Sequence, residues 1–439
     1  MSWRDDSNGP KPEGDMDETR VYEMPKNASK PRKRKRLKQT GIVVLAILLF
    51  MAGTVFGMYS YLKAYSSKYP FSDEDVVAEQ ASSRINILVI GIDGGVNGNT
   101  NLNGKTGTRS DVMMIVSIDP ELNKVGVLSI PRDTRVLIPI VNSIEKAGHA
   151  HAYGGPELVK ATLENLLKID IHRYVRVDFE GFKKVVDTLG GVYIDVPQDM
   201  HYEDPYQDLY IHIEKGPQVL DGQKALEFVR YRGYTNADIG RIEAQHLFIK
   251  ALADKVMRVA TLPKIPQLVS DILPYVLTDL TNEDIMYLAS VGLNMSLENV
   301  EMDILPGVPG YVGDVSYWLI DSEKAEETVD RILRGIDRTK NASVKVAVQN
   351  GSGISGAADY VASILRSYDF DVKSVEEASR VNYSETRVFA PKDNRDVQIE
   401  ILRVLKSTSP QVKAYVSDDM PEEVDVLVVI GNDFNRYGQ

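Results

Sequence analysis

Apolar residues follow two different spacings along most of the chain, and each spacing predicts a different element. The apolar runs INILVIGID (85–93), DVMMIVSIDP (111–120) and KVGVLSIPRD (124–133) predict buried strands. In GPELVKATLENLLK (155–168), apolar residues recur at helical spacing, which predicts a helix. Strands that alternate with helices in this way predict a layered α/β domain.

The same alternation continues downstream. YVRVDFEGFKKVVDTLGGVYIDVP predicts a strand, a helix closed by Gly190 and Gly191, and a second strand. DGQKALEFVRYR and ADIGRIEAQHLFIKALADKVMRV predict two helices, of which the second is long and amphipathic. We place this domain at 84–337, and RGIDRTKNAS reads as a linker.

Residues 343–434 predict a smaller α/β domain of βαββαββ type. Its predicted strands are 344–348, 371–375, 386–390, 412–416 and 425–430, and its predicted helices are 356–367 and 394–406. Gly351, Gly353 and Gly356 form a GxGxxG after the first strand, which is typical of a dinucleotide-binding turn. Too little chain follows for the second half that a dinucleotide fold needs, so we interpret the glycines as a tight strand-to-helix turn.

The N-terminal part has a different pattern. Residues 1–39 are polar and predict a disordered cytoplasmic tail that ends in the basic run RKRKRLK (32–38). Residues 40–62 are uncharged and apolar over a length that spans a bilayer, so they predict an uncleaved transmembrane signal anchor. The basic run places the N-terminus inside, which predicts a single-pass type II protein of the cell membrane with its bulk outside. Residues 63–83 read as a stalk, and Gly53 with Gly57 would allow a homodimer through the membrane helix.

Composition narrows the chemistry. The net charge of -12 excludes a general nucleic-acid binder, which needs excess cationic residues. The chain contains no cysteine, which excludes disulfides, iron–sulfur clusters, thiolate zinc sites and cysteine nucleophiles. His149 and His151 lack a third partner in the sequence and do not make a convincing zinc site.

Arginines and aspartates gather where predicted elements end. They are Arg109, Arg132, Arg230, Arg232, Arg241, Asp93, Asp111, Asp133 and Asp238, and Gln245 follows Arg241 by one helical turn. Ligands of open α/β sheets bind beyond strand ends. Guanidinium groups match phosphate oxygens, and Mg²⁺ takes carboxylates and phosphates, so the pattern suggests a polyphosphate with a hard cation. Salt bridges are the ordinary alternative use of these residues.

Seven blocks carry a resemblance to a known family, in order across about 85–340. They are NILVIGID, TRSDVMMIVSID, VGVLSIPRDTRV, KAGHAHAYGG, VDFEGFKKVVDTLGGV, LDGQKALEFVRYR and DIGRIEAQ. These blocks resemble the LytR-CpsA-Psr family, and VAVQNGSGISGAADYVASILRSYDFDV resembles the LytR C-terminal domain. The resemblance implies a central domain with a mixed sheet flanked by helices. It also implies a phosphotransferase that moves a glycopolymer, such as teichoic acid or capsular polysaccharide, from a polyprenyl-pyrophosphate lipid to peptidoglycan.

The resemblance also implies roles for residues. Asp93 and Asp111 match the Mg²⁺ ligands, and Asp133, Arg132 and Arg109 match catalytic positions. The matching pyrophosphate-binding positions are Arg109, Arg132, Lys146, Arg230, Arg232, Asp238, Arg241 and Gln245. Two departures are visible: Gly148 stands where the family usually has asparagine, and GGVNGNTNLNGKTG (94–107) is inserted between the two metal aspartates.

Several questions stay open at the level of sequence. A peptidoglycan hydroxyl would attack the sugar-linked phosphorus, with Asp133 or a metal-polarised hydroxyl as the base. The apolar faces of 155–168, 181–189 and 243–260 are candidates to line a tunnel for the lipid tail. Alternative functions are a polyprenyl-pyrophosphate phosphatase, or a non-catalytic envelope or regulatory protein, such as a LytR-type transcriptional attenuator, that binds lipid-linked polymer.

Overall fold

A computed structural model describes residues 84–93, 109–205, 209–234, 238–257, 273–292 and 295–435. Residues 1–83, which include the predicted transmembrane segment 40–62, lie outside the described residues, as does the insertion 94–107. Within the described ranges, no helix is both long enough and apolar enough to cross a membrane.

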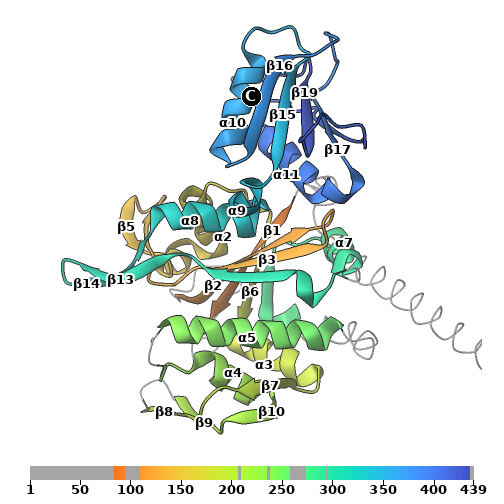
Figure 1. Cartoon of the computed structure of the whole chain (residues 1–439). Helices are drawn as coiled ribbons and strands as arrows, with labels where there is room; N and C mark the ends of the chain where they lie inside the picture. Colours follow the sequence, from red (N-terminus) through yellow and green to blue (C-terminus); the bar gives the residue numbers. More distant parts are fainter. Residues whose placement is uncertain are drawn as a thin grey trace, which may run out of the picture. The chain divides into compact units, whose positions relative to one another are not determined.

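The first domain is built on a mixed six-stranded sheet (Figure 1). In spatial order its strands are β11 (Val276–Thr278), β6 (Arg173–Asp178), β1 (Ile85–Ile92), β2 (Ser110–Asp119), β3 (Lys124–Ser129) and β12 (Val300–Ile304). β1 runs antiparallel to β2 and parallel to β6, and β3 runs antiparallel to β2 and parallel to β12. The three strands predicted from apolar runs are therefore confirmed as the middle of the sheet.

Helices cover both faces of this sheet, as predicted. On one face, α2 (His149–Leu167), α8 (Ser322–Val329) and the π-helical turn η6 (Asp330–Arg334) pack on the largest core cluster. Strand residues such as Leu88, Ile90 and Leu128 are fully buried in that cluster. On the other face, α7 (Asn282–Gly292) packs against Ile85 and Ile87. Figure 1 shows α2 and α8 on the side of the sheet opposite to α5 (Asp238–Met257).

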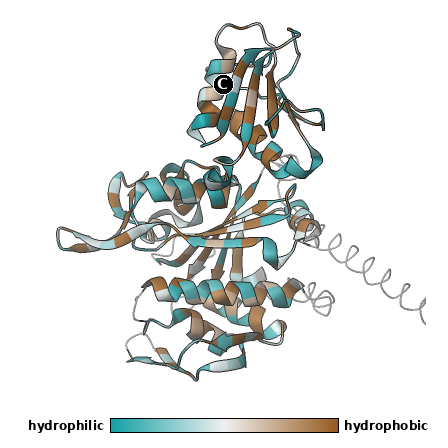
Figure 2. Cartoon of the chain, viewed as in Figure 1, coloured by the Kyte–Doolittle hydropathy of each residue, from teal (hydrophilic) through white to brown (hydrophobic). Residues whose placement is uncertain are grey.

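A second layer of small elements lies beyond α5. It contains α3 (Phe179–Thr188), α4 (Gly222–Arg230), β7 (Val192–Val196) paired with β10 (Gly216–Leu220), and β8 (Met200–Asp204) paired with β9 (Leu209–Ile213). The helix α3 ends before Gly190 and Gly191, which have φ values of 77° and 82°. Positive φ favours glycine, so the predicted helix stop is confirmed. Figure 2 shows hydrophilic and hydrophobic positions alternating along α5, as expected for a helix with one buried side.

Two hairpins that the apolar pattern did not predict complete the domain. They are β4 (Arg135–Ile138) with β5 (Ser143–Lys146), and β13 (Gly307–Val312) with β14 (Val315–Ile320). Thr134 forms an isolated bridge with Trp318, and the Trp318 amide donates to the Asp133 carbonyl (2.8 Å). The hairpin β13–β14 therefore fixes the backbone of the segment that follows β3.

The C-terminal domain has the predicted βαββαββ order. Its elements are β15 (Lys345–Asn350), α10 (Ala357–Ser367), β16 (Asp371–Glu377), β17 (Arg387–Ala390), α11 (Arg395–Leu405), β18 (Lys413–Val416) and β19 (Val426–Ile430). The sheet order is β16-β15-β19-β17-β18, and both helices share one core cluster with the strands. Gly353 and Gly356 have φ values of 73° and 77°, which supports the interpretation of the GxGxxG as a tight turn.

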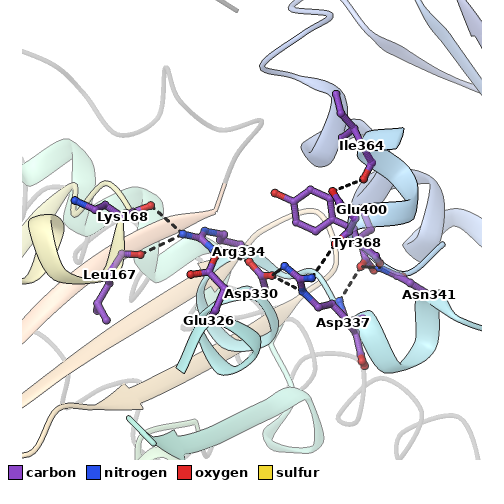
Figure 3. Close-up of polar contacts among 12 residues, drawn as sticks. Leu167, Lys168, Glu326, Asp330, Arg334, Asp337, Asn341, Ile364, Tyr368 and Glu400 are labelled. Atoms are coloured by element: carbon purple, nitrogen blue, oxygen red, sulfur yellow. Dashed lines mark hydrogen bonds and ion pairs between the residues drawn. The ribbon is translucent and has the colours of Figure 1, made fainter. Parts of the chain in front are cut away.

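The segment expected to link the two domains is itself ordered (Figure 3). Asp330 is fully buried and accepts from Arg334 Nη1 (2.6 Å) and Arg338 Nε (2.7 Å). Arg334 Nη2 also donates to the carbonyls of Leu167 and Lys168 (3.1 and 3.0 Å), where α2 ends. These contacts tie η6 to the end of α2, and we call Asp330, Arg334 and Arg338 the junction network.

A buried carboxyl closes the junction on the side of the C-terminal domain. Glu400 of α11 accepts from the Asp337 amide (2.7 Å) and from Asn341 Nδ2 (2.8 Å), as Figure 3 shows. Burial raises the pKa of Glu400 to about 7, more than these two hydrogen bonds lower it. Asn341 lies in α9 (Arg338–Asn341), so the predicted linker is a packed helical turn.

A second buried ion pair joins the same two domains. Asp119, at the end of β2, has a fully buried side chain and pairs with Arg403 of α11 (2.8 Å) and with Arg84 (3.5 Å). Burial lowers the pKa of Arg84 to about 10 against the opposing attraction of Asp119. On the surface, Lys124 Nζ pairs with Asp396 (2.7 Å).

Candidate functional site

The pairing of β1 with β2 brings the two predicted metal ligands to one edge of the sheet. Ile92, the last residue of β1, is paired with Ser110, the first residue of β2. Asp93 and Asp111 are the next residues along each strand, so both lie at the same end of two adjacent antiparallel strands. Burial raises the pKa of Asp93, the charge of Arg230 opposes this, and the negative charge of Asp111 adds to it. The two carboxylates are therefore close enough to repel each other.

Arg132 lies beside these aspartates. It follows β3, whose end is held by a hydrogen bond from the Ile130 amide to the Met113 carbonyl (2.8 Å). Arg132 Nη1 donates to Asp111 Oδ1 at 2.5 Å, and both side chains remain about one-third exposed (29% each). The pair is thus accessible to a ligand that arrives from solvent.

Lys146 and Asp133 form a second ion pair next to the first. Lys146 is the last residue of β5, and its Nζ lies 2.9 Å from Asp133 Oδ1. The Gly148 amide donates to the Arg132 carbonyl (2.9 Å), and the Ala147 amide donates to the Thr134 carbonyl (2.8 Å). The hairpin β4–β5 therefore places Lys146 against the segment that carries Arg132 and Asp133.

A cleft collects most of the remaining predicted residues. It is lined by Asp111, Arg230, Arg232, Arg241 and Gln245 together with Val112, Phe179, Tyr202, Leu209 and Val229. Arg241 and Gln245 lie one turn apart on the buried side of α5, with 6% and 8% exposure. Two polar side chains on a buried helix face, aimed into a cleft, suit a charged ligand better than core packing. We call this space the arginine cleft.

A neighbouring hollow extends the arginine cleft toward the segment after β3. It is lined by Arg132, Asp133 and Arg241 and by residues of β13–β14 that include Trp318. Arg241 borders both spaces. The structure therefore places Arg132, Asp133, Arg230, Arg232 and Gln245 around a common arginine, although they come from three separate segments.

Arg230 is oriented by two contacts. Its guanidinium carbon lies 4.7 Å from the centre of the Phe179 ring, and its Nη2 lies 3.9 Å from Asp93 Oδ2. Gln245 Nε2 donates to the Val229 carbonyl (3.2 Å), which holds the end of α4 against α5. The helix stop at Arg230 thus fixes the guanidinium at the cleft wall.

Two of the predicted site residues, Arg109 and Asp238, differ from those that line the arginine cleft. Arg109 immediately precedes β2 and is exposed, and its charge acts on Tyr153, where it partly opposes a raised pKa. It does not line the arginine cleft among the described residues. Asp238 begins α5, but its side chain lies outside the described part of the structure.

The structure explains why glycine stands at position 148, which is one of the two departures from the family pattern. A Cβ at this position would lie 2.8 Å from the Ser110 carbonyl oxygen and 3.3 Å from Arg132 Cβ. The Ser110 amide also donates to the Gly148 carbonyl (3.1 Å). Close approach of three segments, rather than a positive φ, therefore favours glycine here.

The apolar surroundings divide in a way that the sequence did not show. Val186 of α3 and Ala244 and Phe248 of α5 belong to one core cluster beside the arginine cleft. The apolar side of α2, which includes Leu158 and Leu163, packs instead on the central sheet. Of the three segments expected to line a lipid tunnel, the α2 segment therefore belongs to the core of the central sheet.

Sequence reasoning missed the uncharged wall of the cleft. Phe179, Tyr202 and Leu209 line it, yet nothing in their local pattern separates them from ordinary core residues. A weak signal exists only for Phe179, which follows β6 directly and so stands at a strand end.

Comparison with known proteins identifies the family. The LytR_cpsA_psr family model matches residues 54–333, and the model described as LytR cell envelope-related transcriptional attenuator matches residues 343–434. The chain belongs to the LytR-CpsA-Psr family. Both resemblances inferred from the sequence are confirmed.

Named relatives share the first domain. The teichoic acid transferase TagV of Bacillus subtilis is 28% identical over 324 residues, which cover 71% of this chain and 81% of TagV. TagU of Oceanobacillus iheyensis is 28% identical over 312 residues, covering 67% of this chain and 92% of TagU. Both relatives are named polyisoprenyl-teichoic acid–peptidoglycan teichoic acid transferases. A solved structure of a Streptococcus agalactiae protein shares the fold, with a TM-score of 0.53 and 21% identity over 59% of this chain and 89% of that one.

Proposed function

We propose that this protein transfers a glycopolymer from a polyprenyl-pyrophosphate lipid to peptidoglycan. The observation that carries the proposal is the arginine cleft with its neighbouring hollow, where cationic side chains from three segments border two adjoining spaces next to an apolar cluster. A pyrophosphate needs the first and a lipid tail needs the second. The names of the relatives support the same reaction class.

The arginines would act through charge and position. Phosphoryl transfer spreads negative charge over the phosphate oxygens, and preorganised guanidinium groups stabilise it. We assign Arg230, Arg232 and Arg241 to the pyrophosphate, with Gln245 and Asp238 beside them. We assign Arg132, Arg109 and Lys146 to the side of the transferred group, and Asp133 orients Lys146 through their ion pair.

Magnesium fits the carboxylates at the sheet edge. The negative charge of Asp111 raises the pKa of Asp93, so the two carboxylates are close together. Mg²⁺ commonly takes one or two carboxylates and fills its other coordination positions with water and phosphate. When bound there, Mg²⁺ would neutralise charge on the pyrophosphate.

The proposal also includes the location of the protein at the cell membrane. With residues 40–62 as a membrane anchor, the described domains lie outside the cell membrane, where lipid-linked polymer and peptidoglycan meet. The polymer transferred would be a wall teichoic acid or another envelope polysaccharide.

Two variants test the assignment. Arg132→Ala and Asp111→Ala break the closest ion pair of the site, and we expect each to reduce transfer by about 100-fold or more. The assay follows a synthetic farnesyl-pyrophosphoryl disaccharide and peptidoglycan oligomers with the full-length protein in detergent. Undiminished transfer in both variants would sink the assignment.

The same assay separates the alternatives. Release of the phosphorylated disaccharide without an acceptor would identify a pyrophosphate hydrolase. Tight donor binding without any turnover would identify a binding or regulatory protein instead of a transferase.

A further inference from the structure

Three side chains where β5 leads into α2 form a cluster to which neither the sequence nor the family resemblance gave a role. His149 Nδ1 lies 2.9 Å from Glu145 Oε2, and the Tyr153 hydroxyl donates to the same oxygen (2.8 Å). The Ser143 hydroxyl donates to Glu145 Oε1 (3.2 Å). A single carboxylate thus collects three partners while the His149 side chain keeps 24% exposure.

The backbone next to the cluster contacts the segments that carry the charged site. Gly148, which precedes His149, donates its amide hydrogen to the Arg132 carbonyl (2.9 Å) and accepts from the Ser110 amide (3.1 Å). His149 is therefore one residue away from backbone contacts with both segments that carry site residues. The charged groups on the segments packed against this turn are Glu145, Lys146, Arg109, Asp111, Arg132, Asp133 and Arg135.

The contact with Glu145 sets the hydrogen on the imidazole. Hydrogen bonds from His149 and Tyr153 lower the pKa of Glu145, so this carboxyl is ionised at neutral pH and can only accept. His149 Nδ1 must then carry the hydrogen, and a neutral ring presents its lone pair at Nε2. Within the described part of the chain, Nε2 makes no hydrogen bond.

The carboxylates of the site are engaged differently. Asp133 is bound by Lys146 (2.9 Å), and Asp111 is bound by Arg132 (2.5 Å). A carboxylate that neutralises a cation is a weak proton acceptor, whereas an imidazole oriented by a carboxylate is the usual base of hydrolases and transferases.

We propose that His149 is the general base of the transfer reaction and that Glu145 is its positioning residue. The inference rests on the proposed function. The acceptor hydroxyl gives its proton to His149 Nε2 while its oxygen bonds to the sugar-linked phosphorus. The bond from that phosphorus to the bridging oxygen breaks, and polyprenyl phosphate leaves with the electron pair. The imidazolium then returns its proton to water.

The test is a pH profile of kcat for full-length His149→Gln with the farnesyl-pyrophosphoryl disaccharide and peptidoglycan oligomers. We expect kcat to fall by about 100-fold, with the donor KM within threefold of the wild type. The loss of rate at acid pH that marks a neutral histidine base disappears in the variant. Glu145→Gln lowers kcat by about tenfold, because an amide at this position no longer fixes the hydrogen on His149 Nδ1.

The control is His212→Gln, which alters an exposed histidine on β9 and leaves kcat and its pH profile unchanged. An active wild type with His149→Gln within threefold of it overturns the base assignment alone. A slowed His149→Gln variant with the wild-type acid limb also overturns it, because the histidine would then be structural. A wild type that turns over no donor overturns the proposed function and the base with it.

Discussion

The arginine cleft and the junction network both consist of arginines and aspartates, but the first lines a space for a ligand and the second holds the fold together. At the junction, the Asp330 side chain is fully buried and accepts hydrogen bonds from Arg334 and Arg338. The same two arginines also donate to the backbone carbonyls of Leu167, Lys168 and Ser367. At the cleft, the Asp111 and Arg132 side chains stay 29% exposed, and Arg230 and Arg241 line open space.

The difference lies in what satisfies the guanidinium groups. Helix ends offer carbonyls with no partner inside the helix, and Arg334 takes two of them at the end of α2. A pyrophosphate in the arginine cleft would bring its own oxygens as further acceptors for the guanidinium groups. Arginines that fold a protein are therefore saturated by it, whereas arginines that bind a ligand face a cavity.

The largest effect is expected at the junction. Asp330→Ala removes the fully buried carboxylate that Arg334 and Arg338 share, and both arginines are themselves only partly exposed, so we expect it to lower the free energy of unfolding by about 3 kcal/mol. Urea denaturation of the purified protein measures the change. The matched control is Glu326→Ala, which removes an exposed partner of the same Arg334 and should cost less than about 1 kcal/mol. Equal effects of the two variants would contradict the comparison.

The cleft should respond in the opposite way. Arg230→Ala removes an arginine that faces the cavity, so we expect transfer to fall by about 100-fold while the melting temperature shifts by no more than about 2 °C. Calorimetry and the transfer assay on one preparation check both values. A large loss of stability without loss of transfer would place Arg230 with the junction arginines.

The junction should also give stability a dependence on pH. Because the pKa of Glu400 is about 7 in the folded protein and 4.5 for the ordinary group, the folded state holds an extra proton between these values. Stability therefore falls as pH rises through this window, by up to about 3 kcal/mol. Glu400→Gln keeps the acceptor for Asn341 and should flatten the profile between about pH 5 and 8. Parallel profiles for the wild type and the variant would show that Glu400 does not titrate in this range.

The smallest effect concerns the aromatic wall of the cleft. Phe179→Leu keeps an apolar side chain but removes the ring beside the Arg230 guanidinium, a contact worth about 0.5–1 kcal/mol. We expect the donor KM to rise about threefold with kcat unchanged. A fall in kcat without a change in KM would mean that the ring acts on the reaction rather than on binding.

Much of the fold could be predicted because most of its helices and strands have a clear local spacing of apolar residues. The predicted strand 425–430 became β19 (Val426–Ile430), and the predicted helix 356–367 became α10 (Ala357–Ser367). The hairpins β4–β5 and β13–β14 escaped because their strands are short and half exposed, so apolar alternation is weak. The predicted linker was read as polar chain, although its Arg338 donates to the buried Asp330 and its buried Asn341 donates to Glu400.

By itself, the sequence determined the succession of elements, the family and the identity of the charged residues, because periodicity and motif spacing are properties of the chain. Tertiary structure decided which arginines face a cavity and which are saturated by carbonyls, since Arg334 and Arg230 look alike in sequence. It also decided that Glu145, His149 and Tyr153 meet, because spacings of four are neighbours only once the turn between β5 and α2 has formed. Local pattern fixes elements, whereas burial and pairing depend on where those elements pack.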